Sequence, residues 1–83
     1  MKTNVTIKLN AIADVQKFVQ VTTKHPIEVD LKSGRYIVDG KSILGIFSLD
    51  LTRPIDLTAR SEDSEKVFAF LQDIKNYIVD EEN

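Results

Sequence analysis

Apolar residues recur along the chain at two different spacings, and the change of spacing predicts strands alternating with helices. Every second residue is apolar from Val5 to Leu9, which predicts a strand with one buried face. The following apolar residues are three or four positions apart, which predicts a helix over residues 11–24 with Asn10 as its N-cap. Pro26 ends this helix, because the residue before a proline avoids the α region. The apolar face expected for the helix consists of Ile12, Val15, Phe18, Val19 and Thr22.

The middle of the chain predicts two further strands and a short helix. Residues 27–31 alternate between apolar and charged side chains, and residues 36–38 follow a polar turn that contains Gly34. Residues 43–49 are largely apolar, and Ser42 in front of them is a favoured N-cap. Helical spacing within this stretch favours a short helix over a strand, on the positions Ile43, Ile46 and Phe47.

The last third of the chain predicts a strand followed by a helix. Pro54 opens the alternating strand 55–59, where a proline removes no central hydrogen bond. Ser61 is the expected cap of a final helix with an acidic first turn, and residues 80–83 are expected to be a solvated tail. The apolar stripe of this helix is Val67, Phe70, Leu71, Ile74, Tyr77 and Ile78. The order β-α-β-β-α-β-α predicts a single α+β domain over residues 1–83, with the helices on one face of one sheet.

Composition narrows the classes of function. The chain has 83 residues and a net charge of −2 from 11 basic and 13 acidic residues, which argues against binding to nucleic acid. It contains no cysteine, so neither a disulfide nor a thiolate metal site is expected. No apolar run is long enough to span a membrane and residues 1–20 lack a signal-peptide core, so a cytoplasmic location is expected. With one histidine and no tryptophan, a binding or carrier module without cofactor or metal is expected rather than an enzyme.

Two short features invite chemical interpretations that the rest of the chain does not support. Gly40-Lys41-Ser42 matches the end of a phosphate-binding loop, but Arg35 stands where that motif requires its first glycine. His25 is the single imidazole, and no second histidine accompanies it to form a metal site. A solvated turn, or a cation at a helix C-terminus, explains His25 without a catalytic role.

Ser42 has a second interpretation. At the start of a short helix its hydroxyl lies beside free backbone amides, where a phosphate group would be tolerated. A capping serine and a phosphorylated switch are therefore both open.

The stretch Gly-Lys-Ser-Ile-Leu-Gly-Ile-Phe-Ser-Leu, residues 40–49, resembles the lysine-serine-isoleucine-(leucine or methionine)-glycine block of the HPr family, the histidine-containing phosphocarriers of the bacterial sugar phosphotransferase system. Shorter stretches that resemble the family are Phe18-Val19-Gln20, Ile27-Glu28-Val29 and Ile55-Asp56-Leu57. The resemblance implies an HPr-like open-faced β-sandwich, with a four-stranded antiparallel sheet and three helices on one face.

The resemblance fails at the family's phosphate acceptor. That acceptor is a histidine in a glycine-leucine-histidine-alanine-arginine-proline segment at the start of the first helix, whereas this chain has a shorter segment with Ala11 near the histidine and Ala13 near the arginine. Alanine supplies neither a nucleophile nor a guanidinium. We therefore expect a non-catalytic binding or regulatory module. The alternatives are a phosphoryl carrier that uses Asp14 or His25 as acceptor, or a switch phosphorylated at Ser42.

The resemblance also implies where partners would bind. The family's docking face corresponds here to Lys41, Ser42, Leu44 and Phe47, together with the start of the first helix. The expected partners are proteins, either components of the phosphotransferase system or a regulator, and neither nucleic acid nor a membrane is expected.

Overall fold

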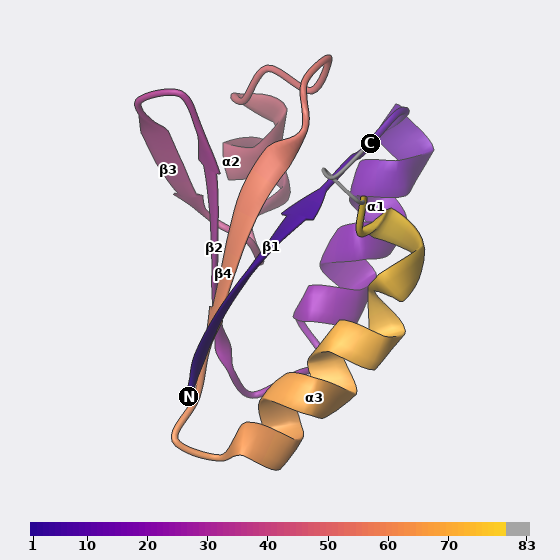
Figure 1. Ribbon diagram of the computed structural model, residues 1–83. Helices are drawn as coiled ribbons and strands as arrows, with labels where there is room; N and C mark the ends of the chain where they lie inside the picture. Colours follow the sequence, from indigo (N-terminus) through magenta and orange to yellow (C-terminus); the bar gives the residue numbers. More distant parts are fainter. Residues whose placement is uncertain (80–83) are drawn as a thin grey trace.

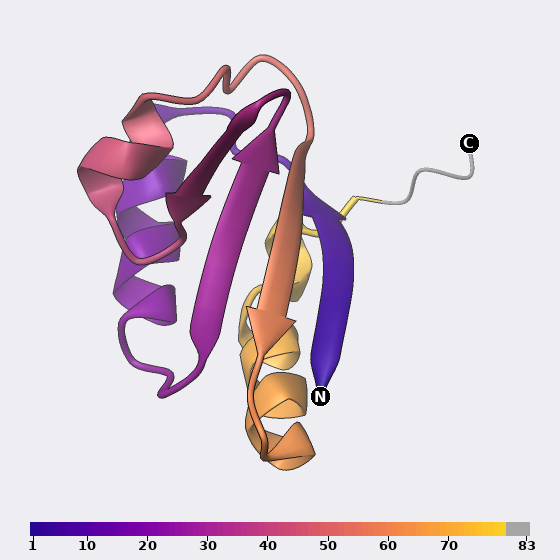
Figure 2. The same cartoon turned by 90° about the vertical axis from the view of Figure 1, so that its left-hand side faces the viewer.

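In the computed structural model, which describes residues 1–79, four antiparallel strands form one sheet with the spatial order β1-β4-β2-β3. Helices α1 and α3 cover one face of this sheet, and α2 lies beside β3 and against α1 (Figures 1 and 2). No helix of residues 1–79 lies on the opposite face, so the α+β open-faced sandwich is confirmed. The strands are β1 (Lys2–Ile7), β2 (Glu28–Ser33), β3 (Tyr36–Asp39) and β4 (Ile55–Arg60).

The helical elements follow the predicted order along the chain. They are α1 (Ile12–Thr22), α2 (Ile43–Phe47), α3 (Ser64–Asp73) and the short 3₁₀ helix η1 (Lys75–Tyr77). Within residues 1–79, no helix is both long and apolar enough to cross a membrane. The tail expected over residues 80–83 lies outside the described part of the chain.

Alternation along the strands separates a buried face from a polar one. Val29 and Leu31 of β2 pair with Ala59 and Leu57 of β4, and these side chains point toward the helices and are almost fully buried. Burying a side chain of this size contributes about 1.5–3 kcal/mol relative to leaving it exposed. The helices complete this core with Val15, Phe18, Val67, Phe70 and Ile74.

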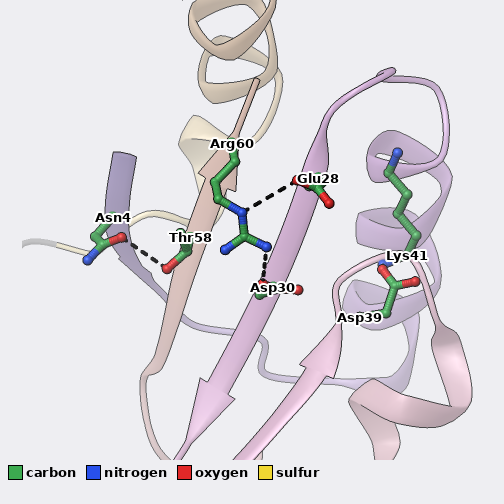
Figure 3. Close-up of polar contacts among 7 residues, drawn as sticks. All are labelled: Asn4, Glu28, Asp30, Asp39, Lys41, Thr58 and Arg60. Carbon is green, nitrogen blue, oxygen red and sulfur yellow. Dashed lines mark hydrogen bonds and ion pairs between the residues drawn. The ribbon is translucent and has the colours of Figure 1, made fainter. Parts of the chain in front are cut away.

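The opposite face of the sheet is held by polar contacts between strands (Figure 3). Arg60 of β4 donates to Asp30 of β2 at 2.6 Å and lies 3.6 Å from Glu28, and these two carboxylates raise the pKa of the Arg60 guanidinium. Thr58 donates to the Asn4 side chain on β1 at 3.0 Å. The open face therefore holds cross-strand polar pairs and does not extend the apolar core.

Two helix starts differ from the sequence-based predictions. Ala11, not Asn10, is the N-cap of α1, and the Asp14 carboxylate accepts from the amides of Asn10 at 2.9 Å and Ala11 at 3.2 Å. Asp63, not Ser61, caps α3 by accepting from the Glu65 amide at 3.0 Å. At α1 the Asp14 carboxylate reaches back to two amides that precede the helix. At α3 the Ser61 hydroxyl accepts from the amide of Asp63 at 3.1 Å, so it lies two residues too early to cap the helix.

Ile12 was expected on the buried face of α1 but is 66% exposed. At about 100° per residue, Ile12 projects about 90° from the centre of the face formed by the buried residues. Those residues are Val15, Phe18 and Thr22.

The last helix is also shorter than its apolar stripe suggests. α3 ends at Asp73, and the chain beyond it pairs with the outer edge of β1. The Lys8 amide donates to the Tyr77 carbonyl and the Val79 amide donates to the Thr6 carbonyl, each at 2.9 Å. Hydrogen bonds to a strand edge thus replace the last turn of the predicted helix.

Gly40, which directly follows β3, contacts both β2 and the end of α1. Its amide donates to the Val29 carbonyl at 2.7 Å, and its carbonyl accepts from the buried Thr22 hydroxyl at 2.9 Å. A Cβ atom at this position would lie 2.4 Å from Cγ1 of Val29, so any larger residue would push the strands apart. The junction sets where the chain turns into α2.

We predict that Thr22→Val lowers the free energy of unfolding by about 1–2 kcal/mol, because the shape is kept while the buried Gly40 carbonyl loses its donor. Urea unfolding followed by circular dichroism measures this change. Thr23→Val is the matched control: the Thr23 hydroxyl bonds to the same helix in an exposed position, so its effect should stay below about 0.5 kcal/mol. Equal losses for the two variants would contradict the role of the junction.

Candidate functional site

The start of α1 presents two alanines and one carboxylate. Ala11 and Ala13 are exposed, and their methyl groups offer neither a nucleophile nor a cation. Asp14 is the ionisable residue at this helix start, and the same oxygen of its carboxylate accepts from both backbone amides described above. The geometry assigns Asp14 to helix capping.

Asp14 also acts electrostatically on Tyr77 of η1, which packs against α1. The Tyr77 ring meets Phe18 edge-on, with 5.5 Å between ring centroids. Burial raises the pKa of the Tyr77 hydroxyl, and the negative charge of Asp14 raises it further. The contact between Phe18 and Tyr77 therefore packs α1 against the C-terminal segment.

Ser42 caps α2 as the sequence predicts. Its hydroxyl oxygen accepts from the Gly45 amide at 3.1 Å, and its side chain is partly exposed. Gly45 allows α2 to lie close to β3, since a Cβ atom there would be 3.2 Å from Cβ of Val38. The hydroxyl expected to be modifiable is thus engaged in one capping hydrogen bond at the start of a single-turn helix.

Lys41 is anchored within the fold. Its ammonium group donates to the His25 carbonyl at 2.7 Å, and its amide donates to the Asp39 carboxylate at 2.9 Å. The side chain therefore spans the gap between the α1–β2 loop and the start of α2. Its hydrogen bonds point to a positioning role for this lysine.

Large apolar side chains are exposed on α1 and α2, as Ile37 is on β3 and Phe68 is on α3. Leu44 is 79% exposed, Ile12 66% and Phe47 40%. Because α1 and α2 pack against each other, these three residues lie on neighbouring helices, and we call them the apolar patch. Leu44 and Phe47 were nominated from the sequence, whereas Ile12 was missed because its spacing places it with the core of α1.

His25 lies in the loop after α1, at the opposite end of this helix from Ala11 and Asp14. Its side chain is 14% exposed, Nε2 is 2.8 Å from a carboxylate oxygen of Asp73, and the ring meets Phe70 edge-on at 5.4 Å. The expectation of a solvated turn is wrong, because the end of α3 covers this loop and supplies both an acidic and an aromatic contact. Along α1, at 1.5 Å per residue, His25 is about 20 Å from Ala11.

No group of three or more potential metal ligands occurs among residues 1–79. The described residues therefore form an apolar patch and a helix cap. The two candidate phosphoryl acceptors, Asp14 and His25, lie at opposite ends of α1, and each is engaged in structural contacts.

Comparison with solved structures identifies the class of protein that shares this arrangement. HPr-C-His from Thermoanaerobacter tengcongensis is 28% identical and superposes with a TM-score of 0.67 over 89% of each chain. The phosphocarrier protein HPr from Bacillus anthracis is 25% identical, with a TM-score of 0.60 over 84% of this chain and 90% of its own. A histidine-containing phosphocarrier protein from a mycoplasma has a TM-score of 0.64 at 13% identity, over 92% and 93% of the two chains.

The fold is therefore that of the HPr phosphocarriers, and the structural neighbours support a relationship to the HPr family. No protein-family model and no curated protein sequence matches the chain. The similarity extends over most of the chain, so the surfaces of α1 and α2 can be compared as parts of one architecture.

Proposed function

We propose that this chain is an HPr-like cytoplasmic protein that does not carry a phosphoryl group and acts as a binding or regulatory module. The observation that carries the proposal is the start of α1, where Ala11 and Ala13 occupy the exposed positions and Asp14 is used as a cap. A phosphoryl acceptor needs a free nucleophilic atom with cationic or amide donors around the transferred group. Neither alanine side chain offers such an atom.

Both non-standard acceptors have structural arguments against them. Phosphorylation of Asp14 would remove the acceptor of two amides at the start of α1. Phosphorylation of His25 at Nε2 would replace its 2.8 Å contact with Asp73 by repulsion between two negative groups. Each modification would therefore oppose a contact that stabilises the fold.

We predict that the general phosphotransferase enzyme and phosphoenolpyruvate leave the mass of this chain unchanged, because no suitable acceptor is available. Intact-mass spectrometry measures the result, with an authentic HPr protein in the same reaction as the positive control. Addition of one phosphoryl group would overturn the proposal. Asp14→Ala and His25→Ala would then show which of the two alternative acceptors carries the group.

The apolar patch supports the binding role. Exposing a leucine and an isoleucine on neighbouring helices gives up burial worth about 1.5–3 kcal/mol for each side chain. Such a surface is suited to a protein partner that buries it, and we propose that partner to be a phosphotransferase-system protein that recognises the HPr fold.

We predict that the wild-type chain competes with authentic HPr for the general phosphotransferase enzyme, and that Leu44→Ser weakens the competition at least about tenfold. The measurement is the rate of phosphoryl transfer to labelled authentic HPr as the competitor concentration is raised. Ile37→Ser is the matched control, since Ile37 is similarly exposed at 64% but lies on β3. Equal effects of the two variants would contradict docking through the apolar patch.

A second candidate function is a switch operated by phosphorylation of Ser42. It is favoured by the position of the partly exposed hydroxyl beside the amides that begin α2, two residues before Leu44. A negative group there would be accommodated by the helix start and would change the charge next to the apolar patch.

We predict that Ser42→Asp keeps the free energy of unfolding within about 0.5 kcal/mol, since aspartate caps as well as serine, and changes the competition several-fold. Ser64→Asp is the matched control, because it places the same charge at the start of α3. If Ser42→Asp competes like the wild type, the switch is excluded. If Ser64→Asp alters the competition as much as Ser42→Asp does, the effect comes from the overall charge of the chain and not from the position of Ser42.

A further inference from the structure

A cleft of about 600 Å³ opens where the turn between β2 and β3 faces the loop between α2 and β4. Figures 1 and 2 both place this turn and this loop at the same end of the sheet. Arg35 and Tyr36 line it from the turn, and Asp50 and Arg53 line it from the loop. We call it the arginine cleft; it is separate from the apolar patch and does not depend on the proposed function.

The backbone presents Arg35 at a fixed place in this cleft. Ser33 pairs with Tyr36, so only Gly34 and Arg35 form the hairpin loop. Gly34 has a φ of +60°, and Arg35 has a negative φ, which is the pattern of a turn that requires glycine at its first central position. A two-residue hairpin turn is short and rigid, so Arg35 is held at the rim of the cleft.

The two guanidinium groups lack strong partners. The Arg53 side chain is 81% exposed, and its one ion pair joins Nε to Asp50 at 3.9 Å, which leaves the two terminal nitrogens available. Across residues 1–79, no hydrogen bond or ion pair engages Arg35. Arginine side chains in this state offer the planar pairs of donors that bind carboxylate and phosphate oxygens.

Asp50 balances only one of the two positive charges. One of its carboxylate oxygens accepts from both the amide and the hydroxyl of Thr52, at 3.0 and 2.5 Å. These two hydrogen bonds lower the pKa of Asp50, which stays ionised beside Arg53 and leaves one positive charge of the cleft unbalanced. The cleft thus has an excess of positive charge in a chain whose net charge is −2.

Tyr36 gives the cleft an aromatic wall. Its side chain is 69% exposed although it is among the largest in the chain, and its ring is free to stack on a planar group. The polar cleft on the open face of the sheet is different, since Lys32 and Asp56 balance each other there and its walls contain no aromatic side chain.

The geometry points to the arginine cleft as a binding site for a small organic phosphate, a free phosphate monoester that carries a planar group. The phosphate would lie between the guanidinium groups of Arg35 and Arg53, and the planar group would lie against Tyr36. Two arginines and one aromatic ring on opposing segments satisfy both parts of such a ligand.

The test is a titration of the ¹⁵N-labelled full chain with phenyl phosphate, inorganic phosphate and phenol, followed by amide chemical shifts. We expect phenyl phosphate to shift the signals of Gly34, Arg35 and Ser48, with inorganic phosphate binding at least about threefold more weakly and phenol not at all. Equal affinity for phenyl phosphate and inorganic phosphate would overturn the role of Tyr36. Unchanged spectra with phenyl phosphate would overturn the site.

Variants distinguish specific binding in the arginine cleft from general attraction between the ligand and positive charge. Arg35→Gln and Arg53→Gln should each weaken phenyl phosphate at least about tenfold, since each removes a charge-assisted hydrogen-bonding pair. Lys66→Gln is the charge-matched control on the exposed side of α3 and should bind like the wild type. Equal weakening by all three variants would overturn the proposal. The proposal would also be overturned if the chain bound a phosphotyrosine peptide but not phenyl phosphate, because the ligand would then be a protein.

Discussion

The arrangement of the helices depends on the close contact between Gly40 and Val29. Only a residue without a side chain fits there, and its two backbone groups bond to β2 and to Thr22 of α1. The short β3 is thereby joined to the end of α1, and the chain is directed into α2. Lys41 reinforces the junction by reaching the His25 carbonyl. The position of α2 against α1, and so the surface that the two helices share, follows from this contact.

The two faces of the sheet are stabilised by different interactions. One face supplies the core with buried apolar side chains, and the other is held by pairs such as Arg60 with Asp30 and Thr58 with Asn4. The apolar side chains left exposed on α1 and α2 therefore lie on the helical layer (Figure 2). A partner that buries apolar area would find Leu44, Phe47 and Ile12 on these helices, whereas the open face carries cross-strand polar pairs.

The start of α1 is held by contacts that involve no imidazole. Asp14 serves as a cap, and Tyr77 with Phe18 supports the helix layer nearby. None of these contacts requires an imidazole, so the architecture does not depend on the acceptor chemistry of the family. A side chain at an exposed helix start can differ without changing the core, because exposed positions contribute little to stability.

Periodicity in the sequence determined the order of elements, the inward residues of the strands and the cap at Ser42, because each depends on neighbours within a few positions. The resemblance in residues 40–49 added the fold family. Only the tertiary structure decided what depends on distant segments: the pairing of His25 with Asp73, the exposure of Ile12, and the strand-like end of the chain beside β1. It also brought Arg35 and Arg53 into one cleft. Local spacing carries no information on which loops meet across a sheet, since that is set by strand order and by close contacts such as the one at Gly40.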